Sequence, residues 1–191
     1  MPLTLISTRR FADARGWFTE NFNAARFSHW GLEYAWCQDN HSYSAEAGTL
    51  RGLHFQTGAH AQTKLVRCSR GVIYDVAVDL RPESPTFKQW RSVHLSAENG
   101  LQLLVPKGYA HGFLTLTPGC EVMYKVDAPY APEADSGVAW DDPELAVDWP
   151  LPPEIALPAL SPKDAVLRRM AALAFDFSYD GQPLSVREIV Q

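Results

Sequence analysis

The amino-acid sequence predicts an all-β fold, an antiparallel sandwich or barrel with a few short helices, one of them near the C-terminus. Short runs of strand-forming residues recur along the chain, and Gly or Pro turns separate them. The clearest run spans residues 71–81, where apolar side chains alternate with Ile73, Asp75, Ala77 and Asp79 at the period of a strand. The face with two carboxylates is expected to meet water or line a polar cavity, with both carboxylates structural or supporting the site.

Length and composition suit one globular domain. The 191 residues can bury a sizeable core, and we expect one domain over 1–191, with its core at about 11–150 and an arm and helix at about 151–191. No uncharged run could cross a bilayer, and the apolar run after Met1 ends too early for a signal peptide. Three scattered cysteines without a C-x-x-C motif fit a cytoplasmic location, and a net charge of −5 gives no support to a nucleic-acid partner.

Turn and capping residues place the other elements. Residues 13–16 form a turn before a strand at 17–22, and residues 24–30 form a short helix with Asn23 as its N-cap. The polar residues 38–42 are expected to be a solvated turn after a strand. A second helix is expected from Ser161, its N-cap, to about Leu173, whereas residues 174–191 have no assignment. Further strands are expected at 49–56, 64–70, 90–95, 101–105, 114–116 and 121–126.

The run of residues 49–56 places a cation and an imidazole three positions apart. In a regular strand, residues two apart share a face, so Arg51 and His54 point to opposite faces. They share one site only if a bulge or twist at Gly52 re-aims one of them, and glycine permits such a bulge. On this run alone His54 is more simply a packed or surface residue, so the hypothesis that it is a catalytic base depends on the rest of the chain.

The sequence offers poor ligands for a metal. A β-barrel metal site usually takes two His one residue apart, with a carboxylate a few positions later and a third His on a later strand. The second His is missing after His54, and a pair formed by His54 and His111 is a poor site. Motifs for nucleotide hydrolysis, hydride transfer and serine esterases are also missing. Metal-free acid–base chemistry by His54, His111, Tyr124, Lys64 and suitable carboxylates remains.

Several motifs, in order from about residue 11 to 165, resemble the dTDP-4-dehydrorhamnose 3,5-epimerase family. Each motif alone is weak, and together they are specific. They are residues 38–40 (QDN), 50–56 (LRGLHFQ), 64–67 (KLVR), 75–81 (DVAVDLR), 84–87 (SPTF), 95–99 (LSAEN), 110–113 (AHGF) and 160–164 (LSPKD).

The resemblance implies a cupin-like jelly roll, a homodimer, and action on a dTDP-4-keto-6-deoxyhexose without a metal or an organic cofactor. By position, His54 matches the base that removes the proton next to the ketone, and Asp164 matches the carboxylate that orients and charges it. Tyr124 matches the acid on the opposite face of the sugar, while Lys64 and Arg51 match cations near the ketone oxygen and the phosphates. Positions that contact the nucleotide sugar hold Arg15, Phe18, Glu20, Gln38, Asn40, His111 and Lys163, together with Tyr130, which matches an aromatic that stacks on thymine.

These roles agree with the chemistry of epimerisation. A C–H beside a ketone becomes acidic when a fixed cation stabilises the enolate oxygen. Imidazole suits the base because it titrates near neutrality. Inversion returns the proton to the other face, so base and acid must be different groups. The reaction expected is conversion of dTDP-4-keto-6-deoxy-D-glucose to dTDP-4-keto-L-rhamnose by inversion at C3 and C5.

Alternatives stay open at this level. A mono-epimerase acting only at C3 or only at C5 would use the same residues, and a metal-dependent cupin or a non-catalytic carbohydrate-binding jelly roll is a more distant alternative. Arg15 and Glu20 could form a surface ion pair, Tyr130 could be a packed turn aromatic, and Asp164 could be a first-turn helix carboxylate. Lys88 stands where the family generally has Gly, and the tail after about residue 170 is longer than usual, so it could form a dimer contact or close the pocket.

Overall fold

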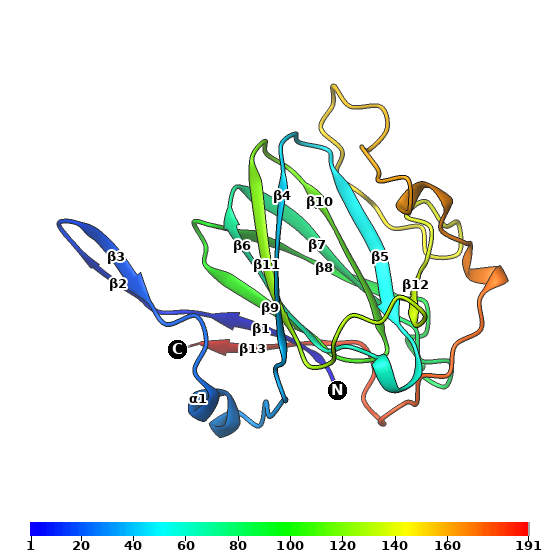
Figure 1. Ribbon diagram of the computed structural model, residues 1–191, viewed down its shortest axis with the longest axis horizontal. Coiled ribbons are helices and arrows are strands. Elements are labelled where there is room, and N and C mark those ends of the chain that lie inside the picture. Colours follow the sequence, from blue (N-terminus) through cyan, green and yellow to red (C-terminus); the bar gives the residue numbers. More distant parts are fainter. Residues whose placement is uncertain (191) are drawn as a thin grey trace.

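Two β-sheets pack face to face, and a separate two-stranded hairpin projects away from them (Figure 1). The computed structural model describes residues 1–190. The predicted all-β sandwich is confirmed, and its strands are antiparallel apart from the parallel β1–β13 pair. The six-stranded sheet runs β13 (Val186–Val190), β1 (Leu3–Ser7), β9 (Leu101–Val105), β6 (Lys64–Arg70), β11 (Cys120–Val126), β4 (Gln38–Ser44). The five-stranded sheet runs β12 (Asp135–Gly137), β5 (Leu50–Gln56), β10 (Tyr109–Thr115), β7 (Val72–Asp79), β8 (Trp90–Ser96), and the hairpin joins β2 (Arg10–Asp13) to β3 (Gly16–Thr19).

The interior between the sheets is apolar in one part and polar in another. Val66, Val122, Ile73 and Phe113 belong to a buried cluster to which both sheets contribute. The outer face of the five-stranded sheet is covered by the irregular arm after β12, in which Trp149 is among the buried side chains. The arm therefore packs as part of the core although it contains little regular structure.

The helices in the described chain are short. The predicted first helix is confirmed as α1 (Ala24–His29), and the Asn23 side chain accepts a hydrogen bond from the Arg26 backbone N–H at 3.2 Å. The remaining helical turns are 3₁₀ segments, η1 (Gly58–His60), η2 (Asp164–Val166) and η3 (Met170–Ala172). None of the helices within residues 1–190 has the length and apolar character needed to cross a bilayer.

Two expectations from the sequence are wrong. The polar residues 38–42 belong to strand β4, in which alternate side chains are exposed and half-buried, because the half-buried ones face a polar cavity and not an apolar core. The helix expected from Ser161 to Leu173 breaks into η2 and η3, with extended backbone between them. Hydrogen bonds to the preceding segment replace the helical ones there, since the Ala139 N–H donates to the Arg168 carbonyl and the Met170 N–H to Asp142.

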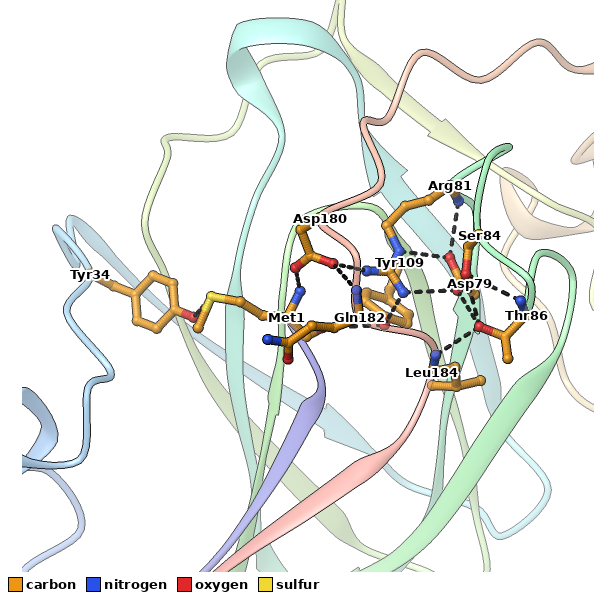
Figure 2. Close-up of polar contacts among 10 residues, drawn as sticks. All are labelled: Met1, Tyr34, Asp79, Arg81, Ser84, Thr86, Tyr109, Asp180, Gln182 and Leu184. Atoms are coloured by element: carbon orange, nitrogen blue, oxygen red, sulfur yellow. Dashed lines mark hydrogen bonds and ion pairs between the residues drawn. The ribbon is translucent and has the colours of Figure 1, made fainter.

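The C-terminal tail, which the sequence left unassigned, is anchored by a buried arginine (Figure 2). The Arg81 guanidinium donates to Asp79 Oδ2 at 2.8 Å and to Asp180 Oδ1 in the tail at 3.0 Å. The Leu184 N–H donates to Thr86 Oγ1 at 2.7 Å, and strand β13 then pairs with β1. This arrangement adds the tail to the edge of the six-stranded sheet.

Lys88, where the resemblance leads us to expect glycine, has a backbone conformation that a glycine would adopt readily. Its φ is +69°, in the left-handed region that is unfavourable for a residue with a Cβ atom. The turn is held because the Lys88 N–H donates to the Asp79 carbonyl at 2.8 Å, and its ammonium group pairs with Glu144 at 2.5 Å. The turn is therefore retained at a cost in backbone strain.

Candidate active site

Strand β5 has a bulge at Gly52, which is the condition for Arg51 and His54 to share one site. His54 lies opposite His111 and Arg51 lies opposite Phe113, so three steps along β5 match two steps along β10. Gly52 has a φ of +115°, and a Cβ atom there would meet the backbone of β10 at 2.7 Å. The bulge brings Arg51 and His54 into the wall of one cavity of about 200 Å³.

His54 forms a hydrogen-bonded pair with Asp164. Its Nε2 lies 2.5 Å from Asp164 Oδ1, which leaves Nδ1 as the ring nitrogen for a substrate. The Asp164 side chain is only 4% exposed, while that of His54 is 28% exposed. Burial would raise the pKa of Asp164, but hydrogen bonds from His54 and Ser161 outweigh it and lower the pKa. Asp164 is therefore a buried, charged carboxylate that can hold and charge an imidazole.

Backbone hydrogen bonds bring Asp164 to a histidine 110 positions earlier. The Leu50 N–H donates to the Ala159 carbonyl at 3.0 Å, so the chain just before Asp164 is tied to the start of β5. Farther along the same edge of β5, the edge opposite β10, Leu53 and Val138 exchange two hydrogen bonds. The arm therefore follows β5 closely, which fixes the distance between the two side chains.

Lys64 and Tyr124 face His54 from the opposite sheet. The three side chains, with Lys163, line both the 200 Å³ cavity and an adjoining one of about 170 Å³. Burial lowers the pKa of Lys64 to about 8, although the charges of Asp135 and Asp75 raise it in part. Burial also raises the pKa of Tyr124, so its phenol stays protonated at neutral pH. The site thus places an imidazole, an ammonium group and a protonated phenol around one space.

His111 belongs to a second buried pair. Its Nε2 lies 2.9 Å from Asp75 Oδ1, and both side chains are buried. Asp75 comes from the mixed face of β7, which the sequence expects to meet water or line a polar cavity; its carboxylate is instead buried against His111, and the residue that borders the cavity is His111. His111 lines the same cavity as His54 and Arg51.

Asp135 is a site residue that sequence reasoning missed. Its carboxylate pairs with the Lys163 ammonium group and accepts a hydrogen bond from the Tyr130 hydroxyl at 2.9 Å. It lies in a short strand within a loop rich in Pro and Ala, where nothing in a single sequence distinguishes it from other loop carboxylates. The second cavity also includes Gln38 and Asn40, whose side chains are hydrogen-bonded at 2.8 Å.

Three predicted contacts lie outside these cavities. Arg15 and Phe18 are exposed residues of the β2–β3 hairpin, which projects from the sandwich (Figure 1). Arg15 pairs with Asp13 in the same hairpin, and Glu20 pairs with Arg26 at 3.2 Å. The surface ion pair considered between Arg15 and Glu20 does not form. Glu20 lines a separate cavity of about 420 Å³, which Tyr124 also borders.

The possible metal ligands of the chain are its His, Cys, Asp and Glu side chains. Within residues 1–190, no group of three or more His, Cys, Asp or Glu side chains is placed to hold a metal ion. The two histidines of the site each face a carboxylate.

Comparisons with known proteins identify the family. The family model for dTDP-4-dehydrorhamnose 3,5-epimerase matches residues 2–172. The chain is 47% identical over 175 residues to such an epimerase from Sinorhizobium fredii, which covers 92% of this chain and 88% of the relative. A Bacillus anthracis crystal structure of this enzyme with TDP and PPi bound has 55% identity and a TM-score of 0.83, covering 87% of this chain and 93% of that one. A Legionella pneumophila structure in complex with dTDP-4-keto-L-rhamnose has 42% identity and a TM-score of 0.84, covering 89% and 88%. The chain belongs to the dTDP-4-dehydrorhamnose 3,5-epimerase family.

Proposed function

We propose that the chain converts dTDP-4-keto-6-deoxy-D-glucose to dTDP-4-keto-L-rhamnose, with His54 as base and Tyr124 as acid. The observation that carries this proposal is the placement of the His54–Asp164 pair, Lys64 and Tyr124 around one space. A base and an acid on opposite walls suit inversion, which removes a proton from one face and returns it to the other.

Each step uses one of these groups. His54 Nδ1 takes the proton from C3 or C5, and the electron pair of the C–H bond moves into the ketone to form an enolate. Lys64 stabilises the enolate oxygen, and Asp164 stabilises the imidazolium. Tyr124 donates its phenolic proton to the opposite face of the carbon, and solvent then restores both groups. No metal takes part in this scheme, so activity should survive exhaustive chelation.

The remaining polar residues bind the nucleotide and the phosphates. Arg51 supplies a guanidinium group, which suits phosphate oxygens. Tyr130 is half-exposed beside the cavity and offers its ring to thymine. Further contacts to the nucleotide sugar come from Gln38, Asn40, His111 and Lys163.

The enzyme acts as a homodimer in which the hairpin of one chain completes the site of the other. Arg15 and Phe18 match positions that contact the nucleotide sugar, yet both are exposed and remote from the site of their own chain. An aromatic ring and a cation on a projecting hairpin suit contacts with a base and a diphosphate across a two-fold axis.

The proposed place of action is the cytoplasm. Free thiols at all three cysteines support action in this reducing compartment.

Hydrogen exchange in D2O tests the reaction. The protein is incubated with dTDP-4-keto-6-deoxyglucose, and deuterium is measured separately at C3 and C5. Label at both carbons supports the double epimerase, label at one makes the enzyme a mono-epimerase, and no label refutes the proposed substrate. His54→Ala should abolish exchange, while Tyr124→Phe should slow turnover more than the first exchange; native exchange in His54→Ala would place the base elsewhere.

Mixing two inactive variants tests the shared site. Refolded together, His54→Ala and Arg15→Ala/Phe18→Ala should recover activity, because each mixed dimer has one complete site. About a quarter of all sites should then be active if the chains associate at random. Failure to recover activity, with mixed dimers present by mass spectrometry, would show that the hairpin does not serve the partner's site.

A further inference from the structure

Ser161 holds Asp164 by two hydrogen bonds. Its hydroxyl donates to Asp164 Oδ2 at 2.9 Å and accepts from the Asp164 backbone N–H at 3.0 Å. The other carboxylate oxygen, Oδ1, lies 2.5 Å from His54 Nε2. Each oxygen of the buried carboxylate therefore faces one donor, and Ser161 and His54 fix its plane between them.

We propose that Ser161 is a positioning residue for the proton transfer, holding the Asp164 carboxylate so that the His54 ring keeps its orientation toward the sugar. The inference rests on the proposed function, because it gives Ser161 its role through His54. Small errors in the direction of a catalytic base lower the rate strongly, which is why such a device matters.

The local backbone explains why a hydroxyl is needed here. A longer helix would hold Asp164 by its own hydrogen bonds, but η2 lasts one turn and the chain is extended from Leu167. The Ala165 N–H still donates to the Ser161 carbonyl at 3.0 Å, which closes that turn. A cap alone requires only that the Ser161 hydroxyl accept from the Asp164 N–H. The donation to Asp164 Oδ2 goes beyond capping and connects the turn to the carboxylate.

The Ser161 hydroxyl also lowers the pKa of the Asp164 carboxyl. Burial opposes a charged Asp164, and the hydrogen bonds from His54 and Ser161 lower its pKa. Without the Ser161 hydroxyl, the carboxylate would be more basic and would hold the imidazolium of His54 more firmly. A higher pH would then be needed to free the base, so the acid limb of the pH–rate profile should move upward.

The experiment compares Ser161→Ala, Ser161→Thr and the parent chain by deuterium exchange at C3 and C5, with kcat and KM measured across pH. For Ser161→Ala we expect kcat to fall about tenfold, as for loss of one hydrogen bond to a charged group, with KM changed less than about twofold. The acid limb should move to higher pH. Ser161→Thr keeps the hydroxyl and should restore both kcat and the pH of the acid limb to those of the parent chain. Ser69→Ala is the matched control, because the Ser69 hydroxyl donates to the Glu121 carbonyl outside the site.

The outcomes separate this inference from the proposed function. A parent chain that incorporates no deuterium refutes the proposed function and the role of Ser161 with it. A parent chain that exchanges, beside a folded Ser161→Ala that keeps the parental kcat and pH profile, refutes only the role of Ser161. Thermal unfolding of each variant identifies loss of activity caused by unfolding, and a Ser161→Thr variant that stays as slow as Ser161→Ala would also overturn the inference.

Discussion

Replacing Lys64 by Met should stabilise the protein while it inactivates the proposed enzyme. Lys64 is a half-buried cation in the wall of the site, and burial is the largest cause that lowers its pKa, to about 8. Met has a similar length and no charge, so it removes the desolvation cost and keeps most of the packing. The same substitution removes the cation proposed to stabilise the enolate, so exchange should fall at least about a hundredfold.

The size of the stability gain depends on pH. The pKa of Lys64 falls from an ordinary value of 10.5 to about 8 on folding. Because the folded value is the lower one, the cost of folding is fully present below about pH 8 and disappears as the pH rises past 10.5. Linkage of these two values gives a cost of about 3 kcal/mol at pH 7 and about 1 kcal/mol at pH 10. Lys64→Met should remove this cost, so it should raise the free energy of unfolding by about 3 kcal/mol at pH 7 and by about 1 kcal/mol at pH 10.

Urea denaturation of both proteins at pH 7 and pH 10 tests the reasoning. At pH 7 the variant should unfold at a higher urea concentration than the parent. At pH 10 the difference between the two unfolding midpoints should be smaller. Lys125→Met is the matched control on the neighbouring strand, because Lys125 forms an exposed pair with Asp39. Its effect should stay within about 0.5 kcal/mol at both pH values. A Lys64→Met protein that is less stable than the parent at pH 7, or equally shifted at both pH values, would refute the argument.

Three further predictions concern strain and charge. Lys88→Gly should raise the free energy of unfolding by about 1 kcal/mol, because the φ of Lys88 is +69° and glycine adopts this value without strain. Lys88→Ala keeps the strain, so an alanine variant as stable in urea as the glycine variant would contradict this. Gly52→Ala should destabilise the protein by more than about 2 kcal/mol, since its Cβ would meet β10 at 2.7 Å. Gly58→Ala is the control, because the new Cβ has space around it and should cost only about 1 kcal/mol. Equal melting temperatures of the two variants would disprove the clash. Asp135→Asn removes a charge that raises the pKa of Lys64, so the alkaline limb of the pH–rate profile should move to lower pH, and an unmoved limb would count against that coupling.

The sequence predicts the parts of the fold that depend on apolar patterning. Strand β7 follows from the alternation of residues 72–80, and α1 follows from Asn23 and Gly31 at its ends. The bulge at Gly52 could be stated as a condition, because Arg51 and His54 can share a cavity only if the strand is irregular between them. In each case the local sequence and the tertiary contacts favour the same structure.

The errors arise where a polar interior replaces the apolar one. Strand β4 carries alternating polar side chains because its inner face lines the cavity, so hydrophobicity gives no strand period there. The segment after Ser161 has good capping residues but no long helix, because its backbone bonds to the 137–142 region. Asp135 was missed because its partners, Lys163 and Tyr130, are brought to it only by the fold. Local patterns cannot carry information about such contacts.

Within residues 1–190, Lys64 forms no ion pair, in contrast to three of the buried carboxylates. Asp75 faces His111, Asp79 faces Arg81 and Asp164 faces His54, so each of these three buried carboxylates has a side-chain partner that offsets its desolvation. Lys64 differs, because in the described part of the chain its ammonium group has only the His54 carbonyl at 3.4 Å as a hydrogen-bond acceptor. A desolvated cation without a matching carboxylate is costly by itself, and negative charge that forms beside it compensates this cost. In the proposed mechanism the enolate oxygen supplies that charge during proton transfer, which is the physical reason why we place Lys64 at the ketone.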